Sequence, residues 1–162
     1  MNYVGAMRQV GPTEYSITIP AFRDGREFTA ATPVHALERA IVGLEDVVLE
    51  RAKAGTLPPP DAGNTEDGGH HQREHLHTSD EQLYRLPVSA YAIAKLSFAR
   101  AFLASDKTRT QFAEELGKSE NEIRRMLDPT YPTKMPMLEH GLRALGKRLS
   151  VKVEELPAVF DF

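Results

Sequence analysis

The side chains with the clearest chemical use lie between Arg109 and Lys134. Asparagine and arginine can form paired hydrogen bonds with adenine and guanine, and glutamate can accept one from cytosine N4. The candidates for contact with base edges are Ser119, Glu120, Asn121, Arg124 and Arg125. The candidates for contact with phosphate, where basic and small polar side chains serve, are Arg109, Thr110, Thr133 and Lys134. Together these residue types are typical of a surface that binds double-stranded DNA.

The spacing of residues 108–127 predicts a helix-turn-helix. Counting Arg109 as the first position, the small Ala113 is fifth, Gly117 is ninth, and the apolar Ile123 and Met126 are fifteenth and eighteenth. A small side chain suits the point where two helices cross, and glycine suits a turn that needs a positive φ. Such a motif places its second helix in a DNA major groove. The alternative is an ordinary pair of antiparallel helices in a helical bundle.

Capping patterns support the two helix starts. Thr108 with Gln111, and Ser119 with Glu122, each form the S/T-x-x-E/Q capping box. Asp128 precedes a proline, which disfavours the helical conformation and therefore ends the second helix.

The remaining reactive residue types do not form a catalytic pattern. A two-metal nuclease needs clustered carboxylates, but the strand region offers only Glu14, Asp24 and Glu27. His35 and His140 lie on amphipathic segments as single histidines, and there is no cysteine. The chain is therefore expected to be non-catalytic, without a cofactor or a bound metal. One alternative is a metal-responsive sensor, because four histidines lie close together at His70, His71, His75 and His77.

Composition and charge narrow the class of protein. The 162 residues suit one ordinary domain or two small ones. No signal peptide or membrane-spanning stretch is visible and cysteine is absent, so we expect a cytoplasmic protein. The net charge of −3 is uneven: residues 1–82 hold 7 basic and 13 acidic side chains, whereas residues 83–162 hold 13 and 10. The basic half suits DNA and the acidic half suits a basic protein partner.

The first half predicts a small α+β unit over residues 1–55. Strands are expected around Tyr3–Met7, Tyr15–Ile19 and Glu27–Ala31, with turns at Gly11-Pro12 and Asp24-Gly25. A helix should begin at Pro33, with Thr32 as its N-cap, and end at Gly55. Its apolar stripe is formed by Val34, Leu37, Ile41, Leu44 and Val48. Residues 56–82 are rich in proline, glycine and histidine and predict a linker.

The second half, residues 83–162, predicts a mainly helical domain. A short extended stretch at Leu83–Val88 should lead into a helix from Ser89 to Ala104. The inner face of this helix is expected to hold Ile93, Leu96, Ala99, Phe102 and Leu103. A further helix is expected at Met137–Leu145, and the alternation in Leu149–Val153 predicts a short strand. Since that strand has no partner in a helical domain, we expect it to pair with a second subunit in a two-fold dimer.

These features resemble HicB-type antitoxins of the HicA/HicB toxin–antitoxin systems. The resemblance rests on the Leu86-Pro87-Val88-Ser89 stretch, the helix-turn-helix, Asp128-Pro129, Thr133-Lys134 and the closing Ala144–Leu149. In the first half, Ile19-Pro20 matches a strand end of the family, Asp24-Gly25 its turn and Ala31-Thr32 its next step, and Ala36 and Ala40 lie on its helix.

The resemblance implies a division of labour between the two halves. The first would have a degraded RNase H-like fold and cover the active site of a small, basic, mRNA-cleaving HicA-like toxin. The second would repress the operon as a homodimer or tetramer formed through the C-terminal domain. We expect the toxin contacts at Tyr15, Phe22, Arg23 and Asp24. The rival interpretation is a stand-alone helix-turn-helix regulator whose first domain senses a ligand or a protein.

Overall fold

The computed structural model describes residues 1–23, 25–60 and 81–153. The chain divides into two compact units. The sheet unit contains Met1–Leu44 and Pro58–Val88, and the helical unit contains Glu45–Leu57 and Ser89–Glu155. The predicted α+β class is confirmed, whereas the RNase H-like detail remains a prediction.

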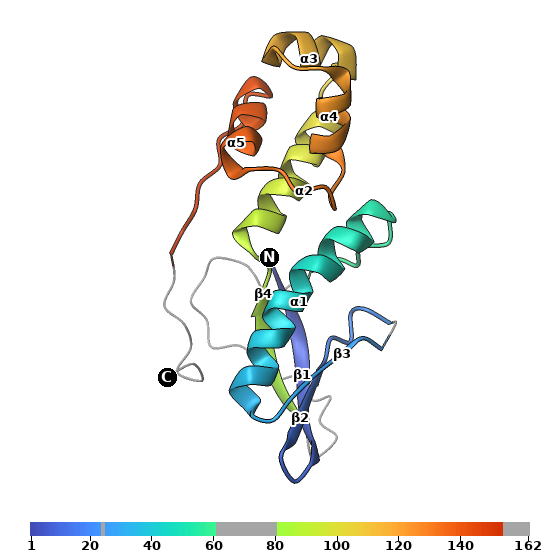
Figure 1. The fold of residues 1–162 in the computed structure, drawn as a ribbon, viewed down its shortest axis with the longest axis vertical. Coiled ribbons are helices and arrows are strands. Elements are labelled where there is room, and N and C mark those ends of the chain that lie inside the picture. Colours follow the sequence, from blue (N-terminus) through green and yellow to red (C-terminus); the bar gives the residue numbers. More distant parts are fainter. Residues whose placement is uncertain (24, 61–80, 154–162) are drawn as a thin grey trace. The chain divides into compact units, whose positions relative to one another are not determined.

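A four-stranded antiparallel sheet forms the first unit (Figure 1). Its strands are β1 (Asn2–Gly11), β2 (Glu14–Thr18), β3 (Glu27–Ala30) and β4 (Gln82–Pro87), in the order β3-β2-β1-β4. Met7 lies opposite Ile17 and Tyr3 lies opposite Leu86, so these apolar side chains share one face. All four are buried, as expected for strands with one face against a core. The three predicted strands are present as β1, β2 and β3.

Helix α1 (Pro33–Lys53) begins as the sequence predicts. The Thr32 hydroxyl accepts a hydrogen bond from the backbone N–H of His35 at 3.3 Å. The first half of α1 lies along one face of the sheet (Figure 1), and Leu37 and Leu44 of its predicted stripe are buried. Gly43 allows close packing there, because a Cβ atom at this position would come within 2.1 Å of the Phe28 ring. Gly55 follows the helix with a φ of 68°, the left-handed conformation expected of a helix stop.

The compact units differ from the predicted domain bounds of 1–55, 56–82 and 83–162. The extended stretch predicted before the second half is present as β4, but it pairs with β1 and therefore belongs to the sheet unit. Conversely, Glu45–Leu57 packs with the helical unit, since Lys53 Nζ lies 2.8 Å from the Asp128 carboxylate and the Ser89 hydroxyl bonds to Glu45. These pairings join residues far apart in the sequence, which a reading of local patterns does not detect.

The helical unit contains α2 (Ala90–Leu103), α3 (Arg109–Leu116), α4 (Glu120–Leu127) and α5 (Met135–Ala144). Its core consists of side chains from all four helices. They are Ala94, Phe98, Phe102, Phe112, Ala113, Ile123, Met126, Leu138 and Leu142. The Phe112 ring lies between those of Phe98 and Phe102, with centroid distances of 6.1 and 5.4 Å.

One prediction for this unit is wrong, and another concerns a segment that was expected to pair with a second copy of the chain. Leu103 was expected in the core but is 81% exposed, because Phe98 rather than Leu103 lies on the inward face of α2. The strand predicted at Leu149–Val153 is not present in the single chain, whose residues 147–153 have no regular secondary structure. A lone strand has no backbone partner in a helical unit, and Val151 and Val153 are 61% and 93% exposed.

Candidate nucleic-acid interface

Helices α3 and α4 are joined by a sharp turn that the sequence predicts correctly. Both capping boxes are formed: Thr108 with Gln111 at the start of α3, and Ser119 with Glu122 at the start of α4. Between them Gly117 has φ 62° and ψ 38°, the left-handed conformation. A Cβ atom added to Gly117 would meet no atom within 4 Å, so glycine is favoured there by backbone conformation and not by lack of space.

The inward positions of the pair are those that the spacing requires. Ala113, Ile123 and Met126 are all buried in the core of the helical unit. Phe112, beside Ala113, has no exposed surface. The apolar side chains thus fix α3 and α4 against α2 and α5, and the opposite sides of both short helices are left to solvent.

The exposed side of α4 carries an ordered set of polar contacts. The Thr110 hydroxyl lies 3.1 Å from the Glu120 carboxylate, which links α3 to α4. Arg124 donates a hydrogen bond to the Asn121 side-chain oxygen at 2.8 Å. Arg125 instead places its guanidinium over the ring of Tyr131, 5.5 Å from the centroid. Asn121, Arg124 and Arg125 are all exposed, as base-reading side chains must be.

The two acidic residues at the start of α4 have structural partners. Glu122 accepts hydrogen bonds from the backbone N–H and the hydroxyl of Ser119, each at 2.9 Å, and lies 3.3 Å from Lys118. These contacts, with the Ser119 backbone first, lower the pKa of the Glu122 carboxyl. Carboxylates at this position also complement the positive end of the helix dipole. Glu122 and Ser119 are thus occupied by capping, whereas Glu120 is the partner of the Thr110 hydroxyl.

The turn from Asp128 to Lys134 is held from inside by a lysine that the sequence reading missed. Lys95 is only 1% exposed, and its Nζ donates to Met126 O at 2.9 Å, Tyr131 O at 3.0 Å and Thr133 Oγ1 at 3.1 Å. Burial lowers the pKa of Lys95 to about 8, opposed by the attraction of Asp128. The residue stands on the buried face of α2 between Ala94 and Leu96, a position that is unusual for lysine and that could have revealed it.

The four predicted phosphate contacts differ in whether their polar groups are free to reach DNA. The Thr133 hydroxyl accepts from Lys95 and the Thr133 backbone N–H donates to the Tyr91 hydroxyl at 2.9 Å, so Thr133 is engaged within the unit. Lys134 is exposed and lies at the N-cap of α5. Arg109 and Thr110 are exposed at the start of α3.

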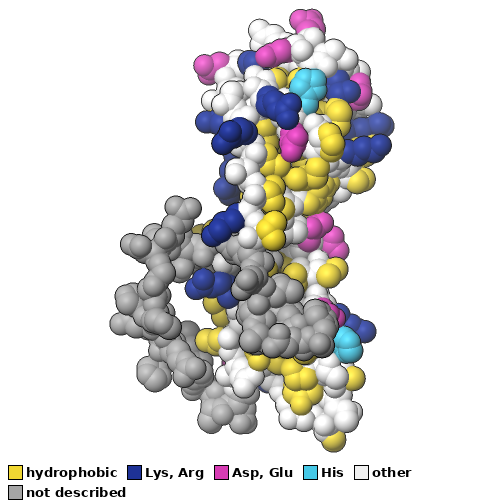
Figure 2. All heavy atoms as spheres, turned by 90° about the vertical axis from the view of Figure 1, so that its left-hand side faces the viewer, with side chains coloured by type: hydrophobic (Ala, Val, Ile, Leu, Met, Phe, Trp, Pro, Cys, Tyr) yellow, Lys and Arg dark blue, Asp and Glu magenta, His cyan; other side chains and the backbone are white. Residues whose placement is uncertain are grey.

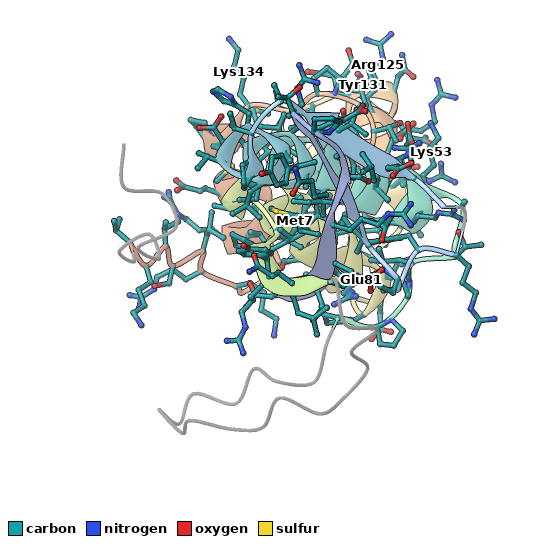
Figure 3. The ribbon with its side chains drawn as sticks, turned by 90° about the horizontal axis from the view of Figure 1, so that it is seen from below. Met7, Lys53, Glu81, Arg125, Tyr131 and Lys134 are labelled. Atoms are coloured by element: carbon teal, nitrogen blue, oxygen red, sulfur yellow. The ribbon has the colours of Figure 1, made fainter. Side chains whose placement is uncertain are left out.

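A second lysine fixes the same turn. Lys53, in the last turn of α1, donates to Asp128 Oδ2 at 2.8 Å and to the Thr130 hydroxyl at 3.0 Å (Figure 3 labels Lys53). The hydrogen bond from Lys53 is the main cause that lowers the pKa of the Asp128 carboxyl. The other carboxylate oxygen of Asp128 accepts from the Thr130 backbone N–H at 3.0 Å. The end of α4 is consequently held by helices from two distant parts of the chain.

The predicted toxin contacts have unequal access to solvent. Phe22 is buried, with its ring centroid 4.8 Å from that of Tyr3, so its expected surface role is corrected to a core role. Arg23 is exposed and Tyr15 is half-buried, while Asp24 lies outside the described residues. Tyr15 lines a cavity of about 320 Å³, together with Met7, Arg8, Gln9, Pro33, Glu81 and Gln82.

Much of the acidic excess of the first half also lies outside the described part. Six of the thirteen acidic side chains before residue 83 occupy position 24 or positions 61–80. The expected acidic surface for a basic partner therefore has no location in the described sheet unit. In that unit Glu27 bonds to the Ser16 hydroxyl and lies 3.4 Å from Arg8, and the Ser16 hydrogen bond is the main cause that lowers the Glu27 pKa.

The metal-sensor alternative depends on clustered metal ligands. Within the described residues, no three histidine or acidic side chains lie close enough together to hold a metal ion. The His70–His77 cluster of the alternative interpretation falls outside them. His35 shares a contact of 2.9 Å with the Thr32 hydroxyl, and His140 is exposed on α5. None of the described helices has the length and apolarity needed to cross a membrane.

The described residues thus define a two-unit α+β protein that presents a capped pair of short helices on its helical unit. Over 73 residues the chain is 32% identical to the protein named Antitoxin HicB from Escherichia coli strain K12, and equally to that of E. coli O157:H7. The matched stretch is 45% of this chain and 51% of each relative, so the chain spans about half the length of the curated relatives it matches. No protein-family model matches the chain.

The predicted resemblance to HicB-type antitoxins is confirmed by these relatives. Both relatives carry the name of an antitoxin.

Proposed function

We propose that this chain is an antitoxin that binds and occludes a small ribonuclease toxin through its sheet unit and represses its own operon through its helical unit. The observation that carries the DNA-binding half is the capped α3–Gly117–α4 arrangement, with Asn121, Arg124 and Arg125 exposed on α4. The similarity to Antitoxin HicB carries the toxin-binding half.

Charge supports the assignment of DNA to the helical unit. The described part of the helical unit, residues 45–57 and 89–153, contains 14 basic and 10 acidic side chains. Three of the acidic side chains, Glu115, Glu122 and Asp128, have lysine partners in Lys107, Lys118 and Lys53. The remaining basic side chains include Arg109 and Lys134, which flank the proposed reading helix in sequence. A surface of this kind attracts phosphate by releasing condensed counterions.

Dimer formation is part of this proposal. A helix-turn-helix protein that reads a palindromic operator does so as a two-fold dimer. Figure 2 shows hydrophobic side chains gathered in a strip, flanked by lysine and arginine, on the face of the helical unit that carries α5. The exposed Val151 and Val153 follow α5 in the same unit, and we propose that they pair with the same segment of a second copy.

Salt-dependent DNA binding tests the repressor half. The full chain should bind duplex from the upstream region of its own gene, and Arg109→Ala or Lys134→Ala should weaken binding about equally on all sequences. Each should also reduce the slope of log affinity against log salt by about 1. Arg143→Ala is the matched control, since Arg143 is exposed at the other end of α5, 3.4 Å from Glu139. Equal losses for Arg143→Ala and the other two variants would contradict the proposed surface.

A further inference from the structure

One exposed aromatic side chain has no role in the function proposed so far. Tyr131 lies in the turn between α4 and α5, and 41% of its surface is exposed. Its ring faces the guanidinium of Arg125, whose central carbon lies 5.5 Å from the ring centroid (Figure 3). An arginine over a tyrosine ring is attracted by the negative face of the ring.

The position of Tyr131 is fixed by its backbone. Its carbonyl accepts from the buried Lys95 Nζ at 3.0 Å, and its N–H donates to Asp128 O at 3.2 Å. Lys95 also binds Met126 O at 2.9 Å, so one ammonium group joins the end of α4 to the turn. The ring is therefore presented to Arg125 by a rigid support, since the same lysine fixes both elements.

The side chains of the two neighbouring arginines of α4 have different partners. The guanidinium of Arg124 is bound to Asn121 Oδ1 at 2.8 Å. Within the described residues Arg125 has no side-chain hydrogen bond, and its one side-chain interaction is the contact with the ring. A stacked guanidinium has one face covered while its edge N–H groups stay free. The free edge is the part that donates two hydrogen bonds to guanine O6 and N7.

We propose that Tyr131 is a positioning residue that orients Arg125 to read one guanine of the operator. This inference rests on the proposed DNA-binding function. It assigns the specific contact to Arg125 in preference to Arg124, and it makes a residue outside the two helices a determinant of specificity. Tyr131 acts through Arg125 and needs no contact of its own with DNA.

The test measures discrimination between bases and not only affinity. The full chain first selects its preferred sequence from a pool of random duplexes, and its affinity is then measured for that sequence and for single-base variants at one salt concentration. Arg125→Ala identifies the base position at which discrimination is lost. Tyr131→Leu, which keeps bulk but removes the ring, should reduce discrimination at that same position by about two- to fivefold. Tyr131→Phe, which keeps the ring, should retain it.

A double variant separates positioning from a general structural effect. In the Arg125→Ala background, Tyr131→Leu should have no further effect on discrimination, because the group that it orients is missing. If Tyr131→Leu leaves discrimination unchanged, or lowers affinity equally on every sequence, the inference is overturned. The proposed DNA-binding function would not be affected by either result. If the unmodified chain selects no sequence, the proposed repressor function and this inference both fail.

Discussion

At the scale of single residues, the buried Lys95 is the group that sequence patterns did not reveal. Its three acceptors, Met126 O, Tyr131 O and Thr133 Oγ1, come from positions more than thirty residues later in the chain. Burying an ammonium group is costly unless its donors are satisfied, and here all three have partners. The lysine therefore joins α2 to the end of α4 and to the turn that follows.

The lowered pKa of Lys95 predicts how stability changes with pH. Below about pH 8 the folded and unfolded chains both hold the proton, so this group gives no pH dependence there. Between about pH 8 and the ordinary lysine value of 10.5, the unfolded chain holds more protons than the folded one. The contribution of Lys95 to the free energy of unfolding should therefore rise with pH across this window.

Chemical denaturation at a series of pH values checks this expectation. The free energy of unfolding of the wild type, relative to Lys95→Met, should increase from pH 8 to pH 10. A relative stability that is flat or falls over that range would contradict the burial of a charged lysine at this position.

The Ser119 N-cap gives a second prediction at the residue scale. Its hydroxyl accepts from the Glu122 backbone N–H at 3.2 Å, so Ser119→Ala should lower the free energy of unfolding by about 1 kcal/mol. Ser97→Ala on the exposed side of α2 is the control and should have little effect. Equal stabilities of the two variants in urea denaturation would show that the cap does not contribute.

At the scale of elements, capping residues in the sequence predicted correctly where helices begin. Thr32-Pro33, Thr108 with Gln111, and Ser119 with Glu122 placed three helix starts correctly, because a cap is decided within four residues. The strand formed by Gln82–Pro87 was recognised as extended, but its pairing with β1 was not, because the two strands lie far apart in the sequence. Leu103 was misplaced for a related reason: the face of α2 that is buried depends on where α3 and α5 pack.

The turn between α3 and α4 should be sensitive to the residue at position 117. Gly117→Ala forces a Cβ atom into the left-handed conformation and should cost about 1–2 kcal/mol of stability. Gly117→Asn should cost less, because asparagine tolerates this conformation. Thermal unfolding of the two variants checks the order, and a loss for asparagine as large as that for alanine would argue against conformational strain as the cause.

At the scale of the whole molecule, the exposed surface of α4 was easier to predict than the division of the chain into units. The exposed polar residues of α4 and their capping could be read from the sequence, because helix periodicity decides them. The internal roles of Thr133 and Phe22, and the shared use of α1 by the two units, follow from tertiary packing and could not be read in that way.

The exposed side chains of Val151 and Val153 predict that the molecule assembles as a dimer. Val151→Asp combined with Val153→Asp should convert a dimer into a monomer, because charged side chains oppose burial at an interface. The change should weaken operator binding as well, whereas Ser150→Asp in the same segment should leave the dimer intact. Light scattering after size-exclusion chromatography gives the mass directly. A wild-type monomer at micromolar concentration would contradict the proposed dimer.

The central claim is the antitoxin role, and growth of cells that express the small open reading frame beside this gene tests it most directly. The account predicts growth arrest when that reading frame is expressed alone and rescue when this chain is expressed with it. A variant with Arg109→Ala and Lys134→Ala should still rescue, because occlusion of the toxin does not require DNA. No arrest, or arrest that this chain fails to relieve, would contradict the antitoxin role.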